Sequence, residues 1–534
     1  MALLPHSLLE VATSLTSPSI LALLLVALPL LYSAIRALRS PLRKIPGPPV
    51  SLFTSAVLRY HELRCHRTSY VHTLHKKYGP VVRLAPDEVS FSSAAAVKDI
   101  YNTAGSGYDK TDFYDLFTVY GRRTMFTTLD KETHARRRRI LADRYANSNI
   151  MRGPALAGIE ERSKHFAELC KNARGGVLVA LHAYAFDCVT HHLFHPYGTD
   201  SLRNESDAEI MREVTFDDSI QNRLVSFYSP ALYAVVNPVL AWFAKPRETP
   251  LADDFVLDTA AKTDAAHFTL LARMHEKQQP YPPDAKDEED RLSKETGMSG
   301  GFDALDAAAE SLDHMAAGID TTGDALCFLM WELSMPRSLH FQERLRRELL
   351  DNAAKGADAL PFDRLPFLDA VITEGLRCFP AIPMSLPRVV PDQHWGRTPR
   401  ASQQQQNNGR VIDGFFLPAG TVVSSQAYSV HRMDTTVFPD PDTFNPDRWL
   451  ASDGDADRKR SFFAFASGGR GCIGKHLALV EMKLLMRDVY SQFATAPEIS
   501  MTPESMEMSD QLISSRPFGQ RCLLQFVPLA EVSS

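Results

Sequence analysis

Apolar residues recur with helical spacing along most of the chain, and polar residues fill the positions between them. The longest such segment covers residues 303–335 and carries apolar side chains on most sides of the predicted helix. A helix with this pattern is expected to run through a core, and Gly301 and Pro336 mark its ends. A second helix is predicted over residues 365–380, where Pro380 ends it.

A shorter part of the pattern is typical of β-structure. Residues 410–430 form short apolar runs around Pro418-Ala-Gly420, which predicts strands with a turn at residues 418–420. Two polar, low-complexity segments, residues 276–301 and 401–409, break the pattern and are predicted to be surface insertions. The pattern as a whole predicts an α-rich domain with a small β portion.

The N-terminal region has a different character. Residues 19–35 contain no charge, and a run of this length is near the lower limit of about 17–25 residues for a membrane-spanning helix. Basic residues follow the run and none precedes it, so the N-terminus is predicted to be lumenal and the remainder cytoplasmic. A cleaved signal peptide would carry a basic region before the apolar run, so a retained anchor is favoured.

These features divide the chain into four parts. Residues 1–18 are predicted to be a short lumenal segment, residues 19–35 a transmembrane anchor, residues 36–50 a basic and proline-rich linker, and residues 51–534 the main domain. The three prolines of residues 44–49 predict a stiff spacer between anchor and domain.

Composition narrows the class of protein. The formal charge of −6 argues against a dedicated nucleic-acid binder, which would carry a basic excess. Seven cysteines are scattered without paired spacing, which indicates reduced thiols instead of a disulfide framework.

One cysteine stands in an unusual setting. Residues 465–478 place four glycines and Arg470 around Cys472, directly before a run with helical periodicity. A phosphate-binding loop would fit the spacing of Gly469, Gly474 and Lys475, but His476 replaces the Ser or Thr that binds magnesium. A buried structural cysteine is the common alternative, and it leaves the glycines and the arginine unexplained.

The third interpretation is a metal ligand. A thiolate before a helix start is stabilised by the helix dipole and free N–H groups, and glycines allow those groups to approach the sulfur. Zinc or an iron–sulfur cluster would need further cysteines at short spacing. A lone thiolate suits a cofactor that supplies its other ligands, such as haem, with Arg470 neutralising a propionate. The residues alone support a single-thiolate cofactor site.

The segment Phe465-x-x-Gly468-x-Arg470-x-Cys472-x-Gly474 resembles the haem-binding signature of the cytochrome P-450 family. The resemblance implies the mainly helical cytochrome P-450 fold in a single large domain. It also implies haem b, with Cys472 as the axial ligand of the iron and with Phe465, Gly468, Arg470 and Gly474 around the cofactor.

Other segments resemble the same family in the same order along the chain. Glu374 and Arg377 resemble its E-x-x-R pair, and Arg448 in "FNPDRW" resembles the arginine that joins this pair in a structural network. The stretch "AAGIDTT", residues 316–322, resembles its oxygen-activating helix segment. There the resemblance implies that Asp320 relays protons and Thr321 assists dioxygen activation. A mid-helix threonine can also bond to the carbonyl four residues earlier, loosen the helix and open a groove.

The haem propionates have their own expected partners. His134 and Arg138 stand where the family often has W-x-x-x-R, so a histidine replaces the usual aromatic residue, and Arg388 resembles another propionate contact. Arg136, Arg137 and Arg139 are either a solvated face or a docking surface for an acidic redox partner.

The resemblance implies a monooxygenase that inserts one atom of dioxygen into an apolar small molecule. It further implies a single-pass protein of the endoplasmic reticulum membrane, supplied with electrons by a separate NADPH–cytochrome P-450 reductase, with cytochrome b5 as a second candidate donor. The pattern is closest to filamentous-fungal members, many of which act in secondary metabolism. The expected pocket segments are residues 108–126, 316–317, 382–386 and 512–514. A haem-thiolate isomerase or dehydratase and a non-catalytic membrane-tethered haem binder are the alternatives.

Overall fold

A computed structural model describes residues 18–102, 108–172, 174–215, 220–243, 248–277, 302–392, 408–511 and 513–529. The first part of the chain forms helices α2 (Pro18–Arg39), α3 (Ala56–Leu63), α4 (Arg67–Tyr78), α5 (Ala94–Val97), α6 (Lys131–Leu141), α7 (Asn147–Ile150), α8 (Gly153–Asn172), α9 (Val177–Phe194), α10 (Glu205–Thr215), α11 (Ile220–Tyr228), α12 (Pro230–Phe243), α13 (Pro250–Ala260) and α14 (Leu270–Glu276). The second part forms α16 (Ala304–Ser334), α17 (Leu339–Ala354), α18 (Pro366–Cys378), α19 (Ala427–Met433), α20 (Asp455–Ser461) and α21 (Lys475–Tyr490).

The strands form four small sheets. A five-stranded sheet has the order β1 (Val81–Ala85), β2 (Glu88–Phe91), β8 (Val422–Ser424), β5 (Arg388–Val389) and β3 (Asp109–Lys110). A second sheet has the order β4 (Arg174–Gly176), β12 (Leu523–Pro528) and β9 (Phe493–Pro497). The two hairpins are β6 (Gly409–Ile412) with β7 (Phe415–Pro418), and β10 (Met508–Asp510) with β11 (Ser515–Pro517). The prediction of a mainly helical fold with a small β portion is confirmed.

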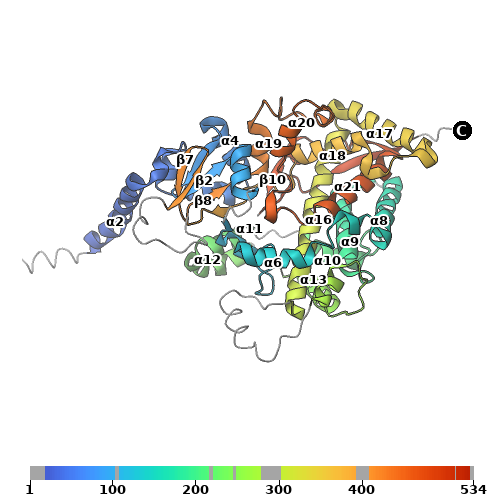
Figure 1. Cartoon of the computed structure of the whole chain (residues 1–534). Helices are drawn as coiled ribbons and strands as arrows, with labels where there is room; N and C mark the ends of the chain where they lie inside the picture. Colours follow the sequence, from blue (N-terminus) through green and yellow to red (C-terminus); the bar gives the residue numbers. More distant parts are fainter. Residues whose placement is uncertain are drawn as a thin grey trace, which may run out of the picture.

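Helix α16 is the central element and runs through the body of the molecule (Figure 1). Its N-cap Asp303 forms a capping box with Asp306, which satisfies free backbone N–H groups at the helix start. Its apolar side chains join the main core together with those of α9, α18 and α21. The predicted bounds of 303–335 therefore differ from the observed helix by one residue at each end.

Some local predictions need correction. Residues 427–433 form helix α19 and not a strand, because the apolar side chains of Ala427 and Val430 lie on one helical face that is buried in a core cluster. The proline-rich linker, predicted to be a stiff spacer, packs on the domain. Its Leu42 and Ile45 are buried against the five-stranded sheet, and Arg83 donates hydrogen bonds to the carbonyls of both residues. The prolines thus shape a segment that packs on the domain.

The N-terminal helix α2 extends away from the body (Figure 1) and contains Pro29. Residues 1–17 of the predicted lumenal segment lie outside the described residues. Among the described residues, one helix is long and apolar enough to cross a membrane by composition, and this is α9. Because 89% of it is buried inside the protein, α9 is a core helix. The membrane anchor stays a prediction. The segment 278–301 and residues 401–407 of the predicted insertions lie outside the described residues.

A buried carboxylate organises the region around α18. Glu374 accepts hydrogen bonds from Arg377 at 2.8 and 2.9 Å, from Arg448 at 3.0 Å and from the indole of Trp449 at 2.8 Å. The backbone N–H of Asn445 adds a further bond at 2.9 Å. Glu374 and Arg377 are fully buried, so each charge depends on these partners. The three predicted members of the network therefore meet, and Trp449 and Asn445 complete it.

Replacing Glu374→Gln should destabilise the protein strongly, because it leaves two buried guanidinium groups without a counter-ion. We expect a loss of about 3–5 kcal/mol in the free energy of unfolding, measured by urea denaturation. The exposed pair of Lys459 and Asp455 provides the control, and Lys459→Ala should cost less than about 1 kcal/mol. Equal losses in both variants would contradict the structural role of the network.

Candidate functional site

The glycine-rich loop places Cys472 just before the N-terminus of α21. Cys472 is exposed, while the other described cysteines are buried or half-buried. The surrounding protein raises the pKa of its thiol, whereas the N–H groups of Gly474 and Lys475 and the charge of Arg138 lower it. Backbone donors thus approach the sulfur, as the glycine pattern predicts. Such donors stabilise a thiolate, which is the form that binds a metal.

A chain of hydrogen bonds connects this loop to the buried network. His431 contacts the carbonyl of Arg377 through Nδ1 at 3.0 Å, and its Nε2 accepts a bond from the N–H of Phe463 at 2.7 Å. Burial lowers the pKa of His431 to about 3, so the ring is neutral with its hydrogen on Nδ1. Further along the chain, the N–H of Cys472 donates to the carbonyl of Phe465 at 2.9 Å. The chain is therefore held by the His431 side chain just before the loop, and the bond from Cys472 to Phe465 closes the loop on itself.

Gly468 of the loop is needed for a reason unrelated to the sulfur of Cys472. Gly468 has a φ of +69°, and a side chain at this position would clash with the backbone of Tyr101 and Asn102. Gly474 lies closer to the chemistry, since a Cβ there would stand 3.9 Å from Sγ of Cys472. The distance at Gly474 is an ordinary van der Waals contact, so sterics require a glycine at 468 but not at 474.

Cationic side chains gather at the edge of the five-stranded sheet beside this loop. Lys110 on β3 pairs directly with Arg388 on β5, an arrangement of like charges that destabilises a sheet. Burial and the charges of Arg388 and Arg470 hold the pKa of Lys110 well below its usual range. Burial and Arg388 also lower the pKa of Arg470 to about 10. Asp109, whose Oδ1 lies 3.5 Å from Arg470, offsets part of this charge, and the remaining positive charge suits an anionic ligand.

The remaining predicted propionate contacts lie in the same cluster. Burial lowers the pKa of His134 to about 2, and the charges of Arg470, Lys110, Arg138 and Arg388 add to the effect, so the imidazole is neutral. A neutral imidazole can still donate a hydrogen bond. Arg138 donates to the carbonyl of Gly471 at 2.6 Å, on the cysteine loop itself. The site thus combines an exposed thiol with a concentration of positive charge, which fits a flat metal cofactor that carries two carboxylates.

Helix α16 presents a narrow uncovered stripe. Most of the helix from Asp306 onward is buried, but Asp313, Ala317 and Thr321 are half-buried or exposed and follow one another at intervals of four residues. Residues with this spacing share one helix face. The hydroxyl of Thr321 donates to the carbonyl of Ala317 at 2.6 Å, which is the expected bond. The helix nevertheless remains continuous through Thr321, so the expected loosening does not accompany this bond.

The four consecutive arginines of α6 have different surroundings. Arg137 is buried and pairs with Glu310 at 2.7 Å and Asp306 at 3.8 Å, so it is not available for docking. Arg136, Arg138 and Arg139 line a surface hollow of about 710 Å³, which also reaches Gly469 of the cysteine loop. The interpretation of a docking face is wrong for Arg137, because α6 turns that residue toward α16, and it stays a prediction for Arg136 and Arg139.

Sequence reasoning missed several residues of this region. Lys110 could have been noticed as the first cation of the aromatic stretch 108–126, between Asp109 and Asp112. His431 has no local signal, because its partners are more than thirty residues away. Glu481 on α21 is also buried; it accepts a hydrogen bond from Thr322 at 3.2 Å, and burial raises its pKa to about 8.

Replacing Lys110→Met should stabilise the cofactor-free protein and weaken its affinity for haem. At pH 7 the buried ammonium is disfavoured, so its removal should add roughly 1 kcal/mol and raise Tm by about 2 °C. Because the pKa of Lys110 is lowered, this gain should shrink as the pH rises and the lysine loses its proton. Differential scanning calorimetry of the haem-free protein measures the gain, and haem titration measures the affinity.

The Cys472→Ser variant separates the contribution of the thiolate from that of the cationic cluster in the same haem titration. It should retain haem binding through the cationic cluster but lose the thiolate-type Soret band in the reduced carbon monoxide complex. Unchanged haem affinity in Lys110→Met, or an unchanged band in Cys472→Ser, would contradict the assigned contacts.

Comparison with known proteins identifies the family of the chain. The family model of cytochrome P450 matches residues 45–520. The chain is 29% identical over 503 residues to the cytochrome P450 monooxygenase aflV of Aspergillus parasiticus, covering 91% of each chain. It is also 29% identical over 500 residues to the cytochrome P450 monooxygenase stcB of Emericella nidulans, covering 91% of this chain and 88% of that protein. The benzoate 4-monooxygenase bphA of Aspergillus niger is 27% identical over 500 residues, covering 90% of this chain and 92% of that protein.

The match of the family model covers most of the chain, including the cysteine loop, the buried Glu374 network and α16. The chain therefore belongs to the cytochrome P450 family and is a haem-thiolate monooxygenase with haem b as its cofactor.

Proposed function

We propose that this monooxygenase hydroxylates an aromatic or otherwise apolar small molecule in fungal secondary metabolism, with electrons from NADPH delivered by a separate reductase. The observation that carries the proposal is the uncovered stripe of α16, which presents Thr321 beside Asp320. Several relatives are monooxygenases of filamentous fungi, and one of them is named for benzoate. These relatives support the substrate class without identifying the substrate.

An aromatic cluster supports an apolar substrate. Phe113, Phe117 and Phe126 are half-buried and contact one another or Tyr114 edge to face, with ring centroids 5.3–5.8 Å apart. Phe227 of α11 extends the cluster at 6.5 Å from Phe113. Aromatic walls of this kind bind flat apolar molecules through large contact areas. The cluster falls in the predicted pocket segment 108–126, while Leu512 of another predicted segment lies outside the described residues.

Each polar residue of the site has a defined task in this proposal. Haem, when bound, supplies the redox chemistry of dioxygen activation. Cys472 would hold the iron through Sγ, and Lys110, Arg388 and Arg470 would hold the propionates. The hydroxyl of Thr321 donates to Ala317, which leaves its oxygen lone pairs free to accept a bond from a group in the pocket. Asp320 holds and releases a proton at its carboxylate; burial raises its pKa to about 6, near working pH.

The two alternatives are less compatible with these residues. A haem-thiolate isomerase or dehydratase has no need to deliver protons to dioxygen, and a non-catalytic haem binder needs no proton relay at all. The acid and the alcohol are both present on α16, and the relatives named above are monooxygenases. A redox partner would dock at the hollow lined by Arg136 and Arg139, next to the cysteine loop, through complementary charge.

Replacing Thr321→Ala should uncouple NADPH oxidation from product formation. Loss of the hydroxyl removes a donor and acceptor from the pocket, so more oxygen should leave as hydrogen peroxide, with product per NADPH falling roughly tenfold. The assay uses the protein with a reductase and an aromatic probe chosen by its Soret shift from a set that includes benzoate and naphthalene. Asp320→Asn should show the same leakage, and Thr373→Ala on the exposed face of α18 is the control. Full coupling in Thr321→Ala would remove Thr321 from the mechanism.

We further propose that α2 anchors the protein in the endoplasmic reticulum membrane with the catalytic domain in the cytoplasm. Leu28, Leu31 and Tyr32 of α2 are each more than half exposed, and so are Val235 and Trp242 of α12. Apolar surface of this extent requires cover, and a lipid bilayer provides it.

Deletion of residues 1–39 should therefore move most of the protein from the microsomal to the soluble fraction. The remaining bound fraction should fall further when Val235 and Trp242 are replaced by serine, because α12 would retain a weaker apolar contact. Replacement of the exposed Leu350 by serine is the control. A truncated protein that remains fully microsomal would contradict the anchor.

A further inference from the structure

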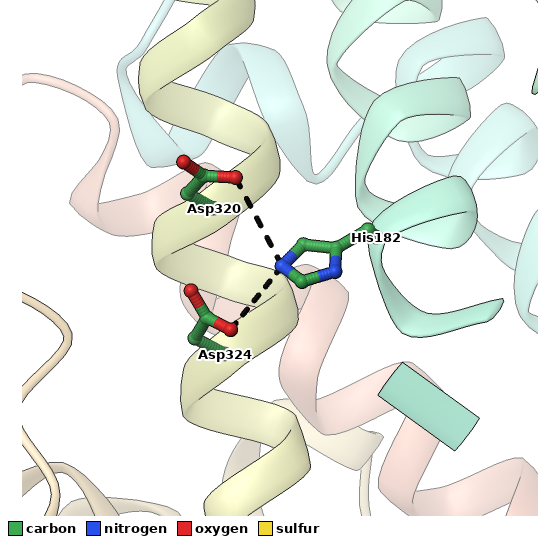
Figure 2. Close-up of side chains that lie close together, drawn as sticks. All are labelled: His182, Asp320 and Asp324. Carbon is green, nitrogen blue, oxygen red and sulfur yellow. Dashed lines mark ion pairs between the residues drawn. The ribbon is translucent and has the colours of Figure 1, made fainter. Parts of the chain in front are cut away.

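A buried group of charged side chains surrounds Asp320. Figure 2 shows His182, which comes from α9, pointing between Asp320 and Asp324, which lie one turn apart on α16. Its Nε2 is 3.3 Å from Oδ1 of Asp324 and 3.9 Å from Oδ1 of Asp320. His182 and Asp324 are almost fully buried, while a quarter of the Asp320 side chain is exposed.

Arg516 on β11 brings a fixed positive charge to the same two carboxylates. Its Nη2 is 3.2 Å from Asp320 and its Nε is 3.7 Å from Asp324. Nη2 also donates to the carbonyl of Thr215, the last residue of α10, at 2.8 Å. The guanidinium is buried, with 4% of the side chain exposed. The cluster of His182, Asp320, Asp324 and Arg516 thus joins helices α9, α10 and α16 to the hairpin of β10 and β11.

The charges of this cluster balance in one protonation state. Two carboxylates and one guanidinium leave a net charge of −1, and a doubly protonated imidazole brings the sum to zero. Buried charges are tolerated when they are paired. The position of Nε2 between two carboxylate oxygens also requires a hydrogen on that nitrogen, because a lone pair there would face other lone pairs. A hydrogen on Nε2 is present both in the neutral Nε2–H tautomer and in the imidazolium, so the charge balance is what favours an imidazolium at His182.

The other titratable groups near His182 do not supply the positive charge that balances the cluster. Glu481 approaches from α21 and hydrogen-bonds Thr322, and the raised pKa of Glu481 keeps it neutral at pH 7. The buried thiol of Cys327, three residues after Asp324 on α16, interacts with Cys522, and burial raises the pKa of Cys327 well above its usual range. The ligand-type atoms of His182, Asp320 and Asp324 lie within 4.8 Å of one another, as in a metal site. Arg516, however, already places a cation on both carboxylates.

We propose that His182 stores a proton for Asp320, and that Asp324 and Arg516 hold the donor and the acceptor in place. The proposal rests on the role of Asp320 as the proton relay. For the transfer, the partly exposed side chain of Asp320 must first close the 3.9 Å gap to hydrogen-bond distance. The Nε2 proton of the imidazolium then moves to Oδ1 of Asp320, which becomes a neutral acid, while His182 becomes neutral with its hydrogen on Nδ1. The net charge of the cluster is unchanged. His182, Asp324 and Arg516 are positioning residues, since they act through Asp320.

Infrared spectroscopy of the Asp320 carboxyl group reports the charge of His182 through the Asp320 midpoint, and it needs no substrate. In the haem-loaded protein, the carboxylic C=O band of Asp320 should disappear with a midpoint near pH 6, and Asp320→Asn should lack the band. Arg516→Met removes a positive charge and should move the midpoint to higher pH by roughly one pH unit or more. His182→Gln should do the same if the histidine is charged. Arg516→Lys should restore the original midpoint, and Arg521→Met, an exposed arginine nearby, should not change it.

Coupling measurements test the storage of the proton. Without His182, Asp320 must be recharged from solvent, so the peroxide released per NADPH should increase with pH in His182→Gln. We expect less than about twofold excess over the parent protein at pH 6 and roughly tenfold at pH 8. Asp324→Asn preserves shape and should give the same pH-dependent excess. A solely structural role would produce a loss that does not vary with pH.

Two outcomes would overturn the proposal. An Asp320 midpoint that is the same in His182→Gln as in the parent protein would show that the histidine is neutral. A peroxide excess that is independent of pH in both His182→Gln and Asp324→Asn would show that no proton is stored. The proposed relay fails separately: if Asp320→Asn remains fully coupled, Asp320 itself has no role in proton delivery.

Discussion

The buried carboxylate of Glu374 determines where the cysteine loop lies. A fully buried anion must be paired, and Glu374 collects Arg377, Arg448 and the indole of Trp449, which come from segments about seventy residues apart. Arg377 in turn contacts His431 through both backbone and side chain, and His431 receives the N–H of Phe463. The pairing of the Glu374 carboxylate thereby fixes the position of the backbone ahead of Cys472. The position of the Cys472 thiol therefore depends on this network without direct contact between them.

At the sheet edge formed by β3 and β5, like charges face each other instead of being paired with opposite ones. Lys110 and Arg388 face each other across two strands, with Arg470 nearby, and like charges in this arrangement oppose folding. The arrangement is consistent with a site that is completed by a dianionic cofactor, whose carboxylates turn repulsion into attraction. Repulsion between Lys110 and Arg388 thus lowers the stability of the cofactor-free protein, and binding of the cofactor raises the stability again by mass action.

Local patterns allowed good predictions, and long-range contacts did not. The bounds of α16, the pairing of Glu374 with Arg377 and the bond from Thr321 to Ala317 follow from spacing within one helix. The sequence did not point to Lys110 because its role depends on Arg388, which is distant in sequence but lies opposite Lys110 in the sheet. Arg137 was misjudged because the buried Glu310 is what turns it inward. The linker and α19 were misread because tertiary packing overrides the local signals of proline and of short apolar runs.

The approach of α9 to α16 has a consequence for sequence change. Gly323 lies between Thr322 and Asp324, and a Cβ at this position would stand 2.5 Å from Cδ2 of His182. A histidine at position 182 therefore fits only opposite a residue without a side chain. A larger residue at 323 is compatible with a smaller one at 182, which would leave Asp324 without its imidazole partner. Related proteins should accordingly change the two positions together, so that glycine at one marks the presence of histidine at the other.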